Sequence, residues 1–197
     1  MRSFLSAIMA GICIAIAGFG YLAVGGTFGA VVFAFGLLAV VSYGLKLYTG
    51  TAGFVDKLDG KFYELFVILI GNIFGCLLVA LLSRVSPLNI NENAQKLLDA
   101  RLNTGWWQCG LLSIGCGFIM TTAVNFARKD KWLPLLFGVP MFIVCGFPHS
   151  IADAFYYLAA PAGFLAAHKL GVLILYISIV IGNFIGCNLY RLFIKND

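Results

Sequence analysis

The chain has 197 residues, of which 61% are hydrophobic and only 11% are charged, and its mean hydropathy is +0.98. A soluble core of this length cannot hide so much apolar surface, so the composition excludes a soluble domain and predicts an integral membrane protein. The formal charge of +5 needs no nucleic-acid partner, because the basic residues lie where membrane topology places them.

Apolar runs along the chain come close to the ~20 residues that a membrane-spanning helix needs. Six runs are present, at residues 4–25, 27–48, 62–83, 105–127, 132–147 and 170–192. They lack the alternating polarity of barrel strands. The first run could be read as a secretory signal peptide, but its length and the apolar runs that follow favour a first spanning helix. We therefore expect an all-α membrane protein with six transmembrane helices, in which residues 148–166 form a polar break and a short half-helix.

A nine-residue string recurs in the third and sixth runs. Residues 68–76 read ILIGNIFGC and residues 179–187 read IVIGNFIGC. The small residues of the GNxxG strings, Gly71, Asn72, Gly75, Gly182, Asn183 and Gly186, would by themselves indicate close helix packing. Recurrence at the same place in each half also indicates duplication: repeat one over about 1–84, an outer loop over about 85–104, and repeat two over about 105–197. Three helices per half require the second repeat to be inverted.

Each half carries an interruption before its GNxxG string. In the first half, residues 45–53 end an apolar run with two glycines and two threonines, and in the second half residues 146–153 hold glycine, proline, histidine and aspartate. Free backbone groups at such breaks are tolerated only around a cavity. Paired discontinuous helices, here the second and the fifth, therefore predict a binding site between them at the membrane midplane.

The distribution of lysine and arginine predicts that both termini are cytoplasmic. With six spans, the inner segments would carry Arg2, Lys57, Lys61, Arg128, Lys129, Lys131, Arg191 and Lys195, and the outer segments only Arg84, Lys96, Arg101 and Lys169.

His149 is the foremost candidate for function, because an ionisable group inside a membrane segment is costly and an imidazole exchanges protons near neutral pH. The alternative is a neutral histidine bonded to a freed carbonyl. Asp153, four residues later, could hold the imidazole or neutralise Lys46. Lys46 is either that partner or a snorkelling anchor at the inner surface.

Small hydroxyl groups near the two breaks could solvate an anion without a fixed charge. They belong to Thr49, Thr51 and Ser150. The sequence contains no nucleophile–base set, phosphate loop or metal-ligand spacing, and its six cysteines lie in apolar runs. We therefore expect no enzyme, no cofactor, no metal and no disulfide.

The ordered set of motifs resembles the formate/nitrite transporter family across nearly the whole chain. The first helix is rich in glycine and alanine, Leu-Tyr-Thr-Gly at 47–50 matches the family's Leu-Phe-Thr break, and GNxxG occurs in both halves. Gly-Phe-Pro-His-Ser-Ile-Ala-Asp at 146–153 matches Gly-Phe-Glu-His-Ser-Ile-Ala-Asn. The resemblance implies a homopentamer of aquaporin-like protomers in a bacterial cytoplasmic membrane, each with its own pore for small monovalent weak-acid anions.

The resemblance also assigns positions. It implies that His149 is the central histidine and Thr49 the threonine of the first break, and it matches the family's outer-mouth lysine to Lys96. It implies apolar constrictions formed by Phe33, Leu37 and Phe142 towards the outside and by Leu47, Tyr48 and Phe147 towards the inside. The chain departs from the family in having Pro148 for the expected acid, Ile114 for its partner asparagine, Lys46 for an acid and Asp153 for an asparagine.

The leading expectation is a channel or proton-coupled transporter for small monovalent anions of the formate and nitrite class, which passes the anion with protons and contains no nucleic-acid site. Hydrosulfide is an alternative substrate. A neutral-solute pore for water, urea or ammonia is a second hypothesis, motivated by Pro148 and the added carboxylate of Asp153. A non-transporting scaffold or sensor is a third.

Overall fold

The computed structural model describes residues 2–54 and 60–193, and this part of the chain is helical without any strand. Four helices are long and apolar enough to cross a membrane, and two shorter apolar helices accompany them. The long ones are α1 (Arg2–Val24), α4 (Gly60–Ser83), α6 (Trp106–Ala127) and α9 (Ala162–Phe193), and the shorter ones are α2 (Gly26–Ser42) and α7 (Leu133–Val144). The expected all-helical membrane protein is confirmed. Lys57 and Lys195, used above to predict orientation, lie outside the described residues.

Three further helices are α3 (Tyr48–Ala52), α5 (Ile90–Thr104) and α8 (Ser150–Ala159). The segment expected to be an outer loop thus contains α5, a helix whose buried residues Ile90, Ala94 and Leu98 recur every fourth position. Charged and amide side chains cover the rest of α5, which made the segment look like a loop. The sixth run was expected to start at 170, and α9 starts at Ala162 but carries a kink at His168.

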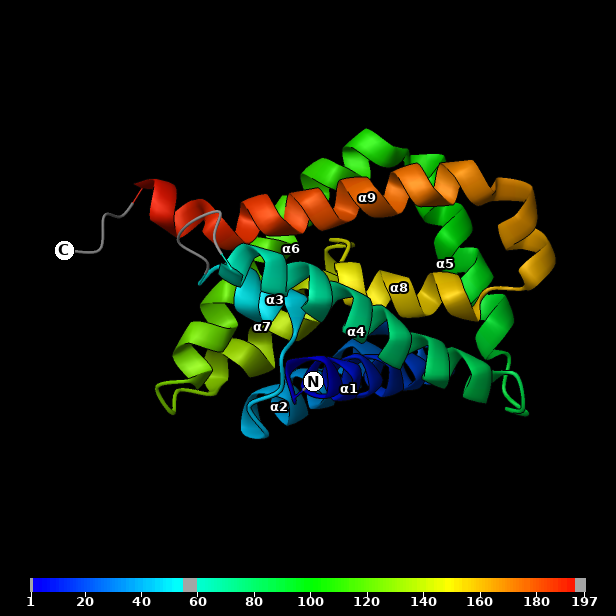
Figure 1. Ribbon diagram of the computed structural model, residues 1–197. Helices are drawn as coiled ribbons and strands as arrows, with labels where there is room; N and C mark the ends of the chain where they lie inside the picture. Colours follow the sequence, from blue (N-terminus) through cyan, green and yellow to red (C-terminus); the bar gives the residue numbers. More distant parts are fainter. Residues whose placement is uncertain (1, 55–59, 194–197) are drawn as a thin grey trace.

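Small residues allow the long helices to pack in close pairs. Helix α1 packs on α4, and α6 packs on α9. A Cβ atom on Gly75 of α4 would lie 2.2 Å from the Ile8 carbonyl oxygen, and one on Gly186 of α9 would lie 2.0 Å from the Ile114 carbonyl oxygen. The GNxxG glycines therefore serve close backbone contact, as small-xxx-small motifs do in membranes. Helix α8 packs against α4, α5 and α9 in the middle of the molecule (Figure 1).

Helices α2 and α7 end in the same kind of turn. After α2, the backbone N–H of Leu45 donates to the Val40 carbonyl at 2.9 Å, and Gly44 has φ +61°. After α7, the N–H of Phe147 donates to the Phe142 carbonyl at 2.9 Å, and Gly146 has φ +70°. This bond, together with a left-handed glycine, is the Schellman arrangement that ends a helix. The chain then continues into α3 after the first turn and into α8 after the second.

The asparagines of the two GNxxG strings hold the backbone at these breaks. The Asn72 side chain accepts from the Tyr48 N–H at 2.9 Å and donates to the Lys46 carbonyl at 2.9 Å. The Asn183 side chain accepts from the Ser150 N–H at 2.7 Å and donates to the Pro148 carbonyl at 3.0 Å. Each asparagine therefore satisfies one donor and one acceptor that no helix bonds, as buried backbone requires.

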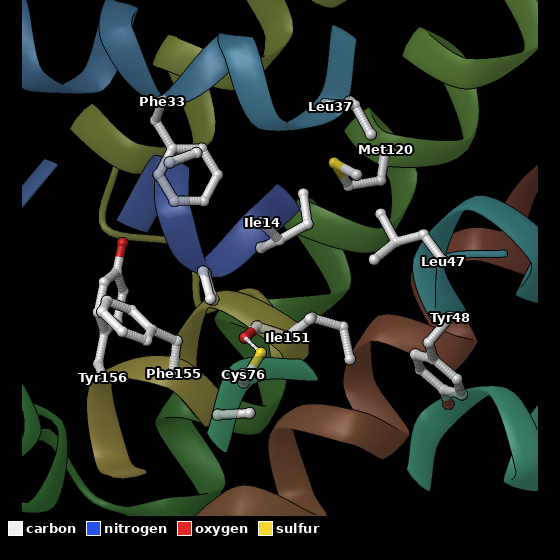
Figure 2. Packing of buried hydrophobic residues seen from close by; sticks show 14 of the residues in the cluster. Ile14, Phe33, Leu37, Leu47, Tyr48, Cys76, Met120, Ile151, Phe155 and Tyr156 are labelled. Carbon is white, nitrogen blue, oxygen red and sulfur yellow. Dashed lines mark hydrogen bonds between the residues drawn. The ribbon is translucent and has the colours of Figure 1, made fainter. Parts of the chain in front are cut away.

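Apolar side chains from both halves of the chain fill the interior around these breaks. Figure 2 shows Ile14, Phe33 and Leu37 above Ile151 and Phe155, with Leu47 and Tyr48 to one side. All of them are buried, Tyr48 being the most exposed at 6%. The first residues of α3 and α8 are thus enclosed by the core.

Candidate functional site

The two breaks meet at Thr49 and His149, which the sequence analysis had singled out separately. Thr49 Oγ1 lies 2.9 Å from His149 Nε2, and both residues are buried, with exposures of 0% and 1%. Thr49 lies in the first turn of α3, and His149 is the residue that precedes α8. A polar contact therefore joins the two interruptions at the centre of the molecule.

His149 also caps helix α8. Its Nδ1 accepts a hydrogen bond from the Ala152 N–H at 3.1 Å, as an N-cap side chain does. An acceptor nitrogen carries no proton, so this bond assigns the neutral ring in which Nε2 is protonated. Nε2–H then donates to the Thr49 hydroxyl. Protonating Nδ1 would break the cap, so the ring is held in one tautomer by the fold.

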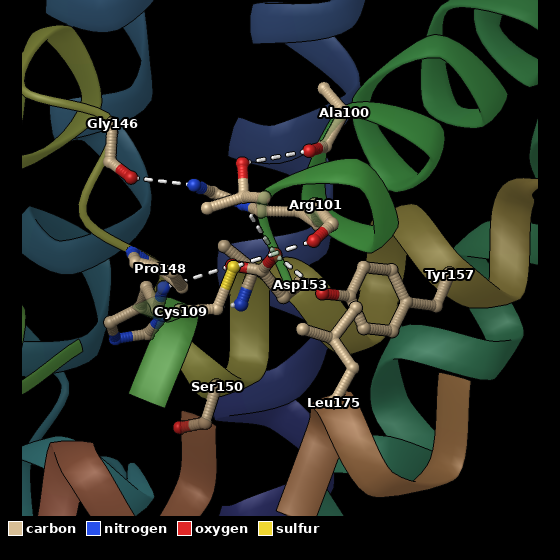
Figure 3. Close-up of polar contacts among 12 residues, drawn as sticks. Ala100, Arg101, Cys109, Gly146, Pro148, Ser150, Asp153, Tyr157 and Leu175 are labelled. Atoms are coloured by element: carbon tan, nitrogen blue, oxygen red, sulfur yellow. Dashed lines mark hydrogen bonds and ion pairs between the residues drawn. The ribbon is translucent and has the colours of Figure 1, made fainter. Parts of the chain in front are cut away.

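Asp153 bonds to the backbone of His149 and to two residues that the sequence analysis did not consider as its partners, Tyr157 and Arg101. Its Oδ2 accepts from the His149 N–H at 2.9 Å, and its Oδ1 accepts from the Tyr157 hydroxyl at 3.0 Å and from Arg101 Nε at 3.3 Å (Figure 3). The expected pairing of Asp153 with either the His149 imidazole or Lys46 is therefore wrong. The carboxylate turns back to satisfy the free N–H at the start of α8, which leaves Oδ1 facing α5.

Arg101 joins α5 to both ends of the second break. Besides Asp153, it donates from Nη1 to the Gly146 carbonyl at 2.5 Å, and its side chain is only 17% exposed. Burial is the largest single effect and lowers the pKa of Arg101, but the Asp153 carboxylate together with Tyr157 and Cys109 outweighs it, and the pKa is raised. Arg101 is therefore a fixed cation. Sequence reasoning placed it in an outer loop, although it falls on the buried stripe of α5, three residues after Leu98.

A small cavity of about 30 Å³, large enough for about one water molecule, lies beside His149. Its lining includes the charged Arg101 and Asp153, His149, and the aromatic rings of Tyr21, Phe142, Phe147 and Tyr156. Phe147 was expected on the other side of the histidine from Phe142. In the structure both residues line this one cavity.

Aromatic and aliphatic side chains flank His149. The Phe142 ring stacks on the imidazole at 5.5 Å between centroids, and Phe33 meets Phe142 edge-on at 6.0 Å. Leu37, expected to lie with these two rings, is drawn in Figure 2 towards Met120 and Leu47, at the opposite end from Phe33. The apolar side chains therefore form one group of rings beside the cavity and one aliphatic group near α3.

Lys46 lies at a second cavity, of about 300 Å³, which is also lined by Thr51 and Arg128. Its ammonium group forms an ion pair with Glu64 and donates to the Ser3 hydroxyl at 2.7 Å. Thr51 Oγ1 donates to the Leu47 carbonyl at 2.8 Å. Lys46 is thus neutralised near the start of α4.

Ser150 and Lys96 lie apart from the Thr49–His149 contact. The Ser150 N–H bonds to Asn183, and its buried hydroxyl has no partner among the described residues. Lys96 is exposed, two residues from both Ala94 and Leu98 and therefore on the outward face of α5. No group of three or more histidine, cysteine or acidic residues that could hold a metal ion occurs in residues 2–54 and 60–193.

Comparison with known proteins places the chain in a family. The sequence profile described as "Formate/nitrite transporter" matches residues 1–194. The formate channel FocA of Haemophilus influenzae is 27% identical in an alignment that covers 84% of this chain and 68% of the relative.

Solved structures agree with this assignment. A pentameric formate channel with formate bound matches with a TM-score of 0.82 and 25% identity, covering 96% of this chain and 93% of that one. An ion channel of the same family, abbreviated FNT, matches with a TM-score of 0.71 and 17% identity, covering 95% and 84%, and supports the fold alone. The resemblance seen in the motifs is confirmed, and the chain belongs to the formate/nitrite transporter family.

Proposed function

We propose that the chain is a membrane channel or proton-coupled transporter for small monovalent weak-acid anions of the formate and nitrite class. The observation that carries the proposal is the buried Thr49–His149 contact, formed where two helix breaks meet in a member of this family. Irregular backbone at membrane depth belongs to a cavity or a pathway, and broken helices mark the binding site of many transporters.

The path runs from the α5 side past Phe33 and Phe142, reaches His149, and continues past Leu37, Leu47 and Tyr48 towards the cavity at Lys46. An anion approaching from outside is attracted by Lys96 and Arg101. It then loses water at the aromatic rings, where carrying a charge is costly. Protonation there yields the neutral acid, which crosses the apolar segment and ionises again on the other side.

The proton comes from water behind the anion in this proposal, and His149 positions the anion. Because Nδ1 accepts from Ala152, the ring offers Nε2–H as a hydrogen-bond donor. Donating the Nε2 proton to the anion would leave a negatively charged ring. Protonating Nδ1 first would avoid that charge, but it would break the cap of α8. A donor shared between Thr49 and a passing anion avoids both costs.

The two halves of the chain, about 1–84 and 105–197, are proposed to be inverted three-helix repeats with broken second and fifth helices. Support comes from their matched contacts. The Cys76 thiol of the first half reaches the Ile151 carbonyl of α8 at 3.3 Å, and the Cys187 thiol of the second reaches the Thr49 carbonyl of α3 at 3.4 Å. Two halves related by a pseudo-twofold axis are expected to make such contacts in pairs, with the cysteine of each half reaching the short helix of the other. Both termini are then cytoplasmic, in a bacterial cytoplasmic membrane.

Five copies are proposed to assemble, each with its own path, as in the relative described as a pentameric formate channel. Apolar side chains on the outer faces of α4 and α9 remain exposed in the single chain, among them Ile70, Phe74, Ile181 and Ile185. Faces of this kind require lipid or neighbouring protomers as partners.

The added carboxylate does not favour a neutral-solute pore. A bare Asp153 would repel anions, but Arg101 and Tyr157 bond it and Arg101 offsets its charge. The Asp153 carboxylate, one of the two observations that motivated that alternative, therefore no longer separates the two functions.

Purified protein reconstituted in liposomes tests the proposal. Stopped-flow influx is measured for formate, nitrite, hydrosulfide, acetate and lactate at two pH values, with swelling in urea measured on the same vesicles. We expect saturable anion influx that rises at the lower pH, and no urea permeability above that of empty vesicles. Swelling in urea without any anion flux would contradict the proposal.

A further inference from the structure

Arg101 and Asp153 form a pair of opposite charges on the wall of the cavity beside His149. Both side chains line that cavity, and their contact atoms lie 3.3 Å apart. The Asp153 side chain is 1% exposed and the Arg101 side chain 17% exposed, so water screens neither charge well. An anion next to His149 is therefore exposed to both charges.

The guanidinium is only partly used by the protein. Arginine has five N–H donors in a planar fork. The hydrogen bonds found in the described part of the chain engage one donor on Nε and one on Nη1. The remaining donors are free for water or for an anion in the cavity, and a guanidinium matches the geometry of a carboxylate or of nitrite.

Asp153 cannot serve an anion in this way. An ionised carboxylate only accepts hydrogen bonds and repels another negative charge. Its two oxygens have separate partners: Oδ2 accepts from the His149 N–H, which needs only a carbonyl oxygen, and Oδ1 accepts from the Tyr157 hydroxyl and from Arg101 Nε. A neutral asparagine could keep the bond to the His149 N–H through its amide oxygen, with its amide nitrogen in place of Oδ1. The negative charge itself thus acts on Arg101 and on whatever enters the cavity.

We infer that Arg101 and Asp153 together determine how strongly the cavity beside His149 binds anions: Arg101 attracts the anion, and Asp153 weakens that attraction by offsetting the charge of Arg101. The inference rests on the proposed anion pathway and deepens it. The pair keeps the site near charge balance, so that a monovalent anion binds weakly enough to leave, which conduction requires. Both residues are specificity determinants of the pathway.

Charge-neutralising substitutions separate this role from a purely structural one. Asp153→Asn keeps the cap and removes the negative charge, whereas Arg101→Gln removes the positive one. The half-saturating formate concentration should fall on the order of tenfold for Asp153→Asn and rise on the order of tenfold for Arg101→Gln. In the double variant, the two changes should cancel to within about threefold of the wild type. Loss of a structural contact would instead impair both single variants in the same direction.

Two matched controls come from charged residues outside the cavity. Asp99→Asn removes an exposed carboxylate from the same helix, α5, and Lys131→Gln removes an exposed cation after α6. Both should leave the half-saturating concentration within about twofold of the wild type, because water screens exposed charges. Arg101→Lys keeps the charge without the fork. It should raise the half-saturating concentration by less than the tenfold expected for Arg101→Gln, and it keeps the test available if Arg101→Gln fails to fold.

Two readouts are taken on each variant: formate influx in proteoliposomes, and the rise in melting temperature that formate causes in detergent, which reports binding alone. Opposite shifts of the two single variants in both readouts support the inference. Shifts in the same direction, or an equal shift in Asp99→Asn, would overturn it. Binding that follows the prediction without any wild-type flux would refute the transport proposal and leave this inference standing. Absence of any response to formate in every variant would refute both.

Discussion

The side chain of Asn183 offers the sharpest test of how the second break is held. It accepts from the Ser150 N–H at 2.7 Å and donates to the Pro148 and Ser113 carbonyls at 3.0 and 2.8 Å. Alanine at this position removes all three bonds. The Ser113 carbonyl lies within helix α6, so the two groups left without partners are the Ser150 N–H and the Pro148 carbonyl.

The free-energy change follows from those two groups. A buried backbone group without a partner costs about 1–3 kcal/mol, so Asn183→Ala should destabilise the protein by about 2–6 kcal/mol. The average contribution measured for a hydrogen bond between membrane helices is lower, about 0.6 kcal/mol, because the unfolded chain in the bilayer finds other hydrogen-bond partners. The N–H at the start of a buried helix has fewer alternatives, which favours the higher range. Asn72→Ala should behave in the same way, through Tyr48 and Lys46.

Thermal unfolding in detergent, followed by circular dichroism, measures the change. Asn188→Ala is the matched control, five residues further along α9, where the side chain is only part-buried and donates to the Ala52 and Phe184 carbonyls. We expect Asn183→Ala to melt well below both the wild type and the control. If Asn183→Ala and the control Asn188→Ala melt at the same temperature, Asn183 does not hold the break and the reasoning is refuted.

Three further substitutions test the packing and the path. Gly186→Ala should destabilise the α6–α9 pair by about 1–3 kcal/mol, because the added Cβ would meet the Ile114 carbonyl oxygen. Its control in the same melting assay is Gly163→Ala, which should be neutral or slightly stabilising because nothing lies within 4 Å of the added Cβ. Phe142→Ala removes the ring beside His149, so it should lower the free energy of unfolding by about 3–5 kcal/mol and raise lactate influx relative to formate influx. An unchanged ratio of lactate to formate influx would contradict the place of Phe142 in the path. Thr49→Val should lower formate influx by about tenfold and destabilise the protein by about 1–3 kcal/mol, because the buried Nε2–H loses its acceptor; undiminished influx would show that the contact plays no part.

Much of the architecture could be predicted from periodicity and repetition. Runs of apolar residues are long enough to define spanning helices, and the GNxxG strings marked equivalent places in the two halves. The breaks at residues 45–53 and 146–153 were recognisable because glycines and polar residues interrupt an apolar run at both places. The sequence explained only part of the GNxxG strings. Small-residue packing accounts for their glycines, but the backbone bonds of Asn72 and Asn183 are made to residues 24 to 35 positions away in sequence.

The partner of Asp153 could not be predicted in the same way. Spacing within one helix suggested His149, and charge suggested Lys46, but neither argument includes a helix elsewhere in the chain. Arg101 reaches the site because α5 folds back over the second break, a tertiary contact that composition hides. The helical stripe through Ala94 and Leu98 was the available signal, and it places Arg101 on the buried face.

The central claim, that His149 in its capped neutral form stands on an anion path, is tested most directly by formate influx in proteoliposomes at two pH values for the wild type, His149→Asn and His149→Phe. Asparagine keeps an acceptor for the Ala152 N–H and removes the imidazole, so that its effect is not one of folding. We predict that both variants lose the pH-dependent influx and that His149→Asn melts close to the wild type. Formate influx with the wild-type rate and pH dependence in a well-folded His149→Asn protein would contradict the account.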